Sequence, residues 1–156
     1  MLSHGNSCLN LSRKMNTSHK NIVYEEGCNV QSKDLDALFH AIGWRARGAK
    51  KWDEVLSKSF YVYTAWNGNT LIGMGRIMED GIMCMFYDIC VHPNYQRRGI
   101  GTKILKKLIF KVKDKNYSSI GLFAWEQNPG TLPFYLNQGF ILKKSGMELE
   151  KYMKRE

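Results

Sequence analysis

Residues 88–102 read Asp-Ile-Cys-Val-His-Pro-Asn-Tyr-Gln-Arg-Arg-Gly-Ile-Gly-Thr and join a strand, a glycine loop and a helix start. The preceding residues 82–91 are apolar, β-branched or aromatic, which predicts a largely buried strand that stops before Pro93. Downstream, apolar residues recur at helical spacing, which predicts a helix that begins near Gly101. Unpaired backbone N–H groups and the aligned peptide dipoles make such a helix start suitable for binding an anion.

The glycine pattern of this loop disfavours two common nucleotide-binding folds. The sequence has neither Gly-x-x-x-x-Gly-Lys-Ser/Thr nor Gly-x-Gly-x-x-Gly, the signatures of nucleoside triphosphatases and dinucleotide-binding folds. The pattern that fits is Gln/Arg-x-x-Gly-x-Gly/Ala, found here at residues 96–101, and it resembles the coenzyme A loop of the GNAT N-acetyltransferases. A second block, residues 128–140, reads Asn-Pro-Gly-Thr-Leu-Pro-Phe-Tyr-Leu-Asn-Gln-Gly-Phe and resembles the later motif of the same family.

The resemblance implies an acetyl-CoA site built mostly from backbone groups. In the family, two parallel strands splay apart, and the pantetheine arm pairs with the first of them as an added strand would. The pyrophosphate would lie on the glycine loop, and the arm of the cofactor would also contact Asn128. The implied cofactor-binding residues are Ile89, Cys90, Val91, Gln96, Arg97, Arg98, Gly99, Ile100, Gly101, Thr102 and Asn128. The resemblance implies no metal, and the cysteines and histidines show no metal-ligand spacing.

Acetyl transfer from a thioester to an amine requires alignment, removal of a proton from the ammonium and protonation of the leaving thiolate. Tyr135 stands in the place of the family's tyrosine and is the candidate general acid; a buried structural aromatic is the alternative. Family members carry a basic residue at about Met85 and Tyr87, but Met85 cannot accept a proton. Asp88 is the nearest ionisable candidate, as base, as anchor for the amine or as a structural hydrogen-bond acceptor, and water-mediated proton removal stays open.

The faces of the central strand restrict these roles. Side chains alternate along a strand, so Tyr87 and Asp88 should point to opposite faces unless a bulge intervenes. Upstream, an aromatic and basic segment is predicted as a helix over residues 34–42, with Ser32 as its N-cap, followed by a second short helix that reaches Ser59. In the family, this segment lines the acceptor side of the cleft, which implies substrate contacts for Phe39, Trp44 and Tyr87. Core packing is the alternative for the aromatic residues of this segment.

The remaining elements predict an α+β (or α/β) fold with a mixed, mostly antiparallel sheet, a central pair of parallel strands and flanking helices. Strands are expected at 22–26, 60–66 and 70–78, the last two joined by an Asn-Gly hairpin. A further strand at 118–125 follows the lysine-rich helix and completes a parallel crossover. A short helix ended by Gly139 and a last strand at 147–153 complete the chain, and Gly73 and Gly75 mark either a ligand site or close helix packing.

Composition bounds the classes of protein. With 156 residues, 44% of them hydrophobic, the chain predicts one globular domain at 19–156 after a flexible leader at 1–18. No run approaches the eighteen apolar residues of a membrane span, and no secretory signal is visible, so a cytoplasmic location without membrane partners is expected. The four cysteines are interpreted as reduced thiols, and Cys90 as a small buried hydrophobe in preference to a nucleophile.

The net charge of +9 has three explanations: nucleic acid, a polyanionic cofactor, or a solvated helix face. Nucleic acid is disfavoured because helix-turn-helix spacing, zinc fingers and the aromatic RNA-binding signature are missing. The function expected is an acetyl-CoA-dependent N-acetyltransferase for a primary amine, with a small molecule favoured over a peptide or protein amine. A non-catalytic acyl-CoA sensor and a basic nucleic-acid-binding module remain alternatives, and the sequence leaves formation of a homodimer open.

Overall fold

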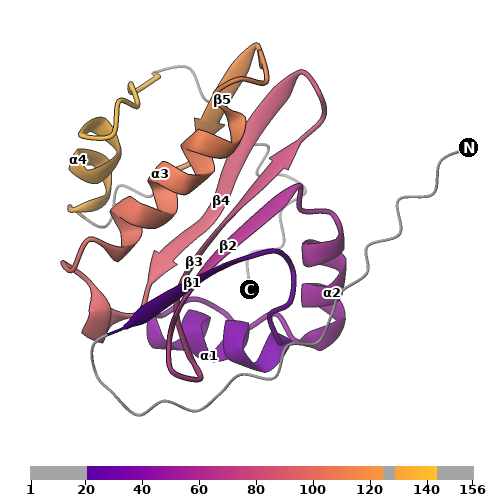
Figure 1. Cartoon of the computed structure of the whole chain (residues 1–156), viewed down its shortest axis with the longest axis vertical. Helices are drawn as coiled ribbons and strands as arrows, with labels where there is room; N and C mark the ends of the chain where they lie inside the picture. The colour runs from indigo at the N-terminus through magenta and orange to yellow at the C-terminus, as the bar shows by residue number, and fades with distance from the viewer. Residues whose placement is uncertain (1–20, 125–128, 144–156) are drawn as a thin grey trace, which may run out of the picture. The chain divides into compact units, whose positions relative to one another are not determined.

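The computed structural model describes residues 21–124 and 129–143, which fall into two compact units divided after Phe123. The first unit contains a five-stranded sheet with flanking helices (Figure 1). Its elements are β1 (Ile22–Glu26), α1 (Ser32–Ala41), α2 (Ala49–Ser57), β2 (Tyr61–Asn67), β3 (Thr70–Glu79), β4 (Met83–Val91), the 3₁₀ turn η1 (Pro93–Tyr95), α3 (Ile100–Val112) and β5 (Ser119–Leu122). The second unit contains α4 (Thr131–Leu136). The predicted leader, Asn128 and the predicted strand at 147–153 lie outside the described residues.

The sheet has the strand order β1-β2-β3-β4-β5. The first four strands pair antiparallel and β5 joins β4 in parallel, which confirms the predicted mixed sheet and its central parallel pair. The hairpin between β2 and β3 turns through Gly68 and Asn69, as predicted, with Gly68 at a φ of 58°. The strand predicted at 118–125 is shorter, because β5 ends at Leu122.

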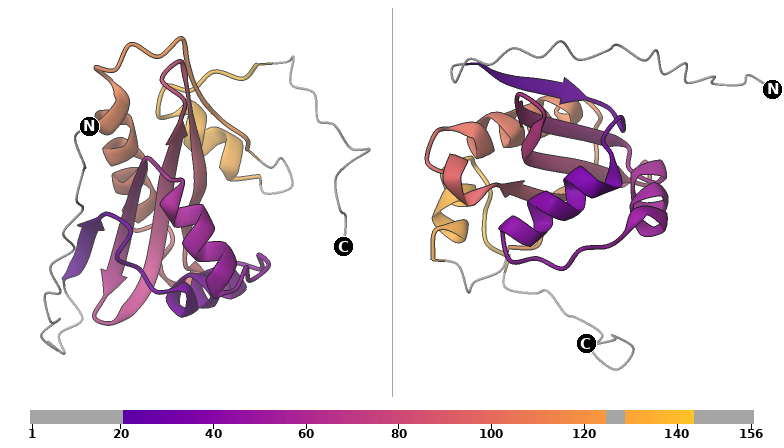
Figure 2. Two further views of the ribbon diagram at one scale, coloured as in Figure 1. Left: turned by 90° about the vertical axis from the view of Figure 1, so that its right-hand side faces the viewer. Right: turned by 90° about the horizontal axis from the view of Figure 1, so that it is seen from below.

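The helices of the first unit cover opposite faces of the sheet. The left view of Figure 2 shows the strands between α3 on one side and α1 with α2 on the other. Alternation along β3 separates the two layers: Gly73 and Gly75 face α3, whereas Met74 packs in the core with α1 and α2. A Cβ atom on Gly75 would lie 2.8 Å from Cγ2 of Ile104 and 3.0 Å from Cδ1 of Leu108. The two glycines therefore allow close helix packing, which is the second of the two predicted explanations.

Gly75→Ala is expected to lower the free energy of unfolding by about 1–3 kcal/mol, because an added methyl group overpacks the interface between β3 and α3. Urea unfolding followed by circular dichroism measures the change. Gly121→Ala is the matched control, since the nearest atom to its Cβ would be the flexible thioether sulfur of Met85 at 3.3 Å. Equal stability of the Gly75 variant and the parent chain would contradict the close packing of α3.

The ends of two helices differ from the sequence-based expectation by one residue. α1 begins at Ser32 with Gln31 as its N-cap, so Ser32 is the first helical residue and not the cap. α3 begins at Ile100 with Gly99 as its N-cap, one residue before the predicted start. In the second unit, Pro133 lies in the first turn of α4, as predicted, where its missing N–H removes no helical hydrogen bond.

Candidate active site

The loop between β4 and α3 presents backbone N–H groups at a helix start. Gly99 has a φ of 76° in the left-handed region, and no side chain caps the N-terminus of α3. The loop is held from behind by Nε2 of Gln96, which donates a hydrogen bond of 2.9 Å to the carbonyl of Val91. Arg97, with a φ of 61°, and Arg98 are both exposed in this loop. A left-handed glycine, first-turn amides and two guanidinium groups fit a pyrophosphate.

The end of β4 provides a free strand edge beside this loop. In the part of the chain that the structure describes, β5 pairs with β4 over Met83–Phe86, and β4 continues alone on that side to Val91. Ile89, Cys90 and Val91 therefore have backbone groups open toward the side of β5. An extended chain with amide groups, such as a pantetheine arm, could pair there as an added strand does.

Cys90 has a buried side chain in the core cluster between the sheet and the helices α1 and α2. Burial raises the pKa of its thiol, and the negative charge of Asp88 raises it further. A thiol that resists ionisation is a poor nucleophile. The structure thus places Cys90 as the small buried hydrophobe that the sequence predicts.

A β-bulge brings Tyr87 and Asp88 to one face of β4. Met74 pairs with Cys90 and Arg76 pairs with Tyr87, so β4 carries one extra residue opposite Gly75. Asp88 has a φ of 51°, in the left-handed region that aspartate tolerates better than most residues. Both side chains then contact Arg76, whose guanidinium carbon lies 4.9 Å from the Tyr87 ring centroid. The condition under which the two could share a cleft is met.

Asp88 forms ion pairs with two arginines. Nε of Arg76 donates to Oδ2 of Asp88 at 2.5 Å, and Nη2 of Arg47 donates to Oδ1 at 3.1 Å. The side chains of Arg76 and Asp88 are 7% and 9% exposed, so this pair is shielded from water. Because each carboxylate oxygen already accepts a guanidinium hydrogen bond, the geometry favours the structural role of Asp88 over the role of base.

Arg47 is a residue of the site that the sequence analysis did not single out. Its guanidinium carbon lies 5.3 Å from the ring centroid of Phe39 and 5.2 Å from that of Trp52, within the range of cation–π contacts. Its backbone N–H donates to Oδ1 of Asp36, which also accepts from Nε1 of Trp52 at 2.6 Å. The available signal was the Gly/Arg/Lys link between the two predicted helices, but nothing local marks one arginine of that link.

The predicted substrate residues have different environments. Phe39 is 1% exposed and packs edge-on against Trp44 and Trp52, so it has no face for a ligand and belongs to the core. Trp44 is 39% exposed, and Tyr87 is partly buried beneath Arg76. Burial opposes ionisation of Asp36, but hydrogen bonds from the Arg47 backbone and the Trp52 indole keep its pKa below the ordinary value. Asp36 thereby ties α1 to the start of α2.

The lysines of α3 contact aromatic rings of β1 and β2. Nζ of Lys103 lies 3.9 Å from the Tyr24 ring centroid, and Nζ of Lys111 lies 4.7 Å from that of Tyr61. Lys107 pairs with Glu26 at 2.6 Å, and the hydrogen bond between them raises the pKa of the lysine. Much of the basic charge of α3 is therefore used in packing and pairing on the outer strands, which weakens the interpretation of this helix as a nucleic-acid face.

Tyr135, the candidate general acid, lies in α4 of the second unit. It is 9% exposed, and its ring packs edge-on against Phe134 and Phe140 at centroid distances of 5.1 and 5.8 Å. Within residues 21–124 and 129–143, no group of three or more His, Cys, Asp or Glu could hold a metal ion. No helix in the same ranges is long and apolar enough to cross a membrane.

The fold and the glycine loop agree with a comparison against known families. The model described as the acetyltransferase (GNAT) family matches residues 25–140. The chain belongs to the GNAT family. GNAT proteins of this kind are acetyl-CoA-dependent acyltransferases, and the splayed strand edge and helix start described above are where this GNAT chain fits the coenzyme.

Relatives of this GNAT chain include a ycf52-like N-acetyltransferase of Prochlorococcus marinus, 29% identical over 80% of this chain and 70% of that protein. Histone acetyltransferase TAP1 of Glycine max is 31% identical over 81% of this chain, which spans 59% of that protein. A GNAT family acetyltransferase of Streptococcus pneumoniae, 27% identical, superposes with a TM-score of 0.70 over 87% of this chain and 100% of that one. An acetyltransferase of Clostridium acetobutylicum, solved with acetyl-CoA, has 18% identity and a TM-score of 0.63 over 85% of this chain and 100% of its own.

Proposed function

We propose that this protein transfers the acetyl group of acetyl-CoA directly to a primary amine of a small molecule. The observation that carries the proposal is the free edge of β4 at Ile89–Val91, followed within a few residues by the uncapped start of α3. An amide-containing arm that ends in a pyrophosphate matches both features at once. Bound acetyl-CoA supplies an acetyl group already activated as a thioester.

The residues of the chain then have separate roles in the proposed reaction. Residues 96–102 hold the pyrophosphate, and Ile89, Cys90 and Val91 hold the arm through backbone hydrogen bonds. Tyr135 donates a proton to the departing thiolate. Arg76 and Arg47 hold Asp88 and thereby the bulge, which orients the end of β4 toward the acceptor. Because both oxygens of Asp88 are engaged, we propose that water removes the proton from the ammonium.

The resemblance also places Asn128 beside the arm of the cofactor, and this contact stays a prediction. The chain's relatives support acetyl transfer but differ in their acceptors, as the name of the soybean protein indicates. We favour a small amine because the acceptor segment, α1 to α2, brings its aromatic and basic side chains close together. A cytoplasmic location and a homodimer also remain predictions.

Gly101→Glu is expected to abolish the response of the chain to acetyl-CoA, because a carboxylate at the start of α3 repels the pyrophosphate. In a thermal-shift titration, acetyl-CoA at 100 times its Kd should stabilise the parent chain by about 2.7 kcal/mol. Duplex DNA in parallel, at matched salt, tests the nucleic-acid alternative. Stabilisation by DNA without stabilisation by acetyl-CoA would overturn the enzyme proposal, and binding of acetyl-CoA without turnover of any amine would favour the sensor.

A further inference from the structure

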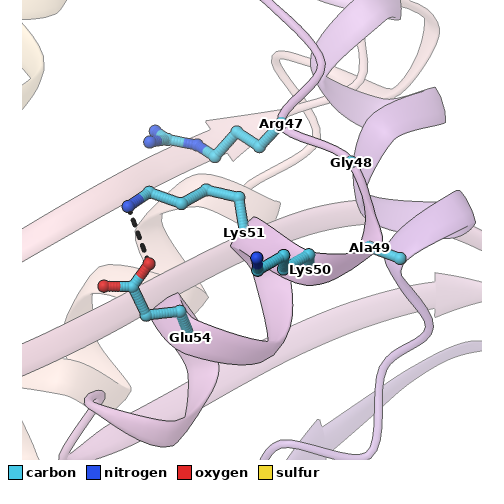
Figure 3. A pocket seen from close by; sticks show the side chains of 6 residues that line it. All are labelled: Arg47, Gly48, Ala49, Lys50, Lys51 and Glu54. Carbon is cyan, nitrogen blue, oxygen red and sulfur yellow. Dashed lines mark hydrogen bonds and ion pairs between the residues drawn. The ribbon is translucent and has the colours of Figure 1, made fainter.

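A cavity of about 330 Å³ opens at the link between α1 and α2. Figure 3 shows its lining residues, Arg47, Gly48, Ala49, Lys50, Lys51 and Glu54. Three of the four charged side chains are cationic. The one carboxylate, that of Glu54, is already paired with Lys51 at 2.8 Å and with Lys58 at 2.7 Å. The cavity therefore offers positive charge to a ligand.

The charge available to a ligand belongs to side chains and not to the start of α2. Asp36 already accepts hydrogen bonds from the backbone N–H groups of Arg47 at 2.8 Å and Gly48 at 3.1 Å. Among the described residues, Lys50 has no ion-pair partner, and its side chain is exposed. Lys50 is therefore free to bind an anion.

Arg47 connects this cavity to the proposed reaction site. It lines the cavity, and its Nη2 donates to Oδ1 of Asp88 on the bulge of β4. The bulge directly precedes Ile89–Val91, the strand edge proposed to hold the cofactor arm. Stacking on Phe39 and Trp52 fixes the guanidinium in place. A molecule in the cavity would thus lie about one side chain away from the bulge.

We infer that this cavity binds a carboxylate of the acceptor, so that the preferred substrates are small amines that also carry an acidic group. This inference rests on the proposed function and narrows its substrate class. Lys50 supplies the unpaired charge, and Arg47 offers the guanidinium N–H groups that do not contact Asp88. A neutral amine lacks the group that these cations bind, and a lysine-rich peptide meets repulsion from the same cations.

The test compares matched amines that differ in one carboxylate, under saturating acetyl-CoA. The pairs are phenylalanine with 2-phenylethylamine and β-alanine with propylamine, and a lysine-rich peptide forms a separate arm. One charge-assisted hydrogen bond should favour the acidic member of each pair by about 10- to 100-fold in kcat/KM. Lys50→Gln should narrow that ratio by about 3- to 10-fold, whereas Lys106→Gln, an exposed lysine of α3 on the opposite face of the sheet, should leave it unchanged.

The outcomes separate this inference from the proposed function. Equal turnover within each pair, an unchanged ratio in Lys50→Gln, or preference for the lysine-rich peptide would overturn the anion site while leaving acetyl transfer intact. If no amine is acetylated, the proposed function fails, and calorimetric titration of 3-phenylpropanoate still tests the cavity. Binding that Lys50→Gln weakens and Lys106→Gln does not would support the site, and absence of binding to the parent chain would overturn it.

Discussion

Arg76→Met should lower the free energy of unfolding by about 3–5 kcal/mol. The guanidinium of Arg76 pairs with Asp88, and both side chains are less than a tenth exposed. Removing the arginine leaves a shielded carboxylate on a bulged, positive-φ residue, with Arg47 as its remaining cationic partner at 3.1 Å. Chemical denaturation with a fixed transition slope measures the loss of stability.

Two further variants test whether the loss arises from the unpaired charge. The double variant Arg76→Met with Asp88→Asn should recover part of the lost stability, because asparagine is neutral and also tolerates the left-handed backbone. Arg98→Met, in the exposed glycine loop, should change stability by about 0.5 kcal/mol or less. If the double variant were as unstable as the sum of its single changes, the ion pair would not be the stabilising interaction.

Tyr135→Phe should lower turnover about 10²- to 10⁴-fold, because the variant cannot protonate the departing thiolate. Affinity for acetyl-CoA should change little, since the proposed cofactor contacts come from β4 and the glycine loop. The phenyl ring can still pack between Phe134 and Phe140, so the fold should be preserved. Steady-state release of thiol measures turnover, and the thermal shift with acetyl-CoA measures binding on the same preparation.

Tyr117→Phe is the matched control, because Tyr117 lies in the turn between α3 and β5 and has no proposed role. It should keep the turnover of the parent chain. Full turnover in Tyr135→Phe would remove Tyr135 from the mechanism and leave it as a buried aromatic. A loss of turnover together with a lower melting temperature would indicate a packing effect instead.

Local residue choices were sufficient to predict most of the fold. The left-handed Gly99 and the helical spacing that follows it predicted a helix start within one residue of α3. The Asn-Gly hairpin and the strand-helix-strand order predicted the antiparallel strands and the parallel pair of β4 and β5. These features depend on residues close together in the chain, and backbone geometry restricts each of them strongly.

The arrangement around Asp88 could not be derived in the same way. Asp88 lies 12 residues from Arg76 and 41 from Arg47, and the bulge that turns it toward both depends on the register between β3 and β4. An ion pair leaves no periodic pattern in a sequence, so neither partner could be identified there. The lysines of α3 show the same limit, because their partners are tyrosines of distant strands.

The sequence by itself thus determined the family, the glycine loop and the cofactor class. Only the tertiary structure decided that Phe39 is core, that Asp88 is held by two arginines, and that Arg47 joins a cationic cavity to the strand edge. The physical reason is that backbone conformation follows from neighbouring residues, whereas burial and charge pairing follow from which distant segments the sheet and its bulge bring together.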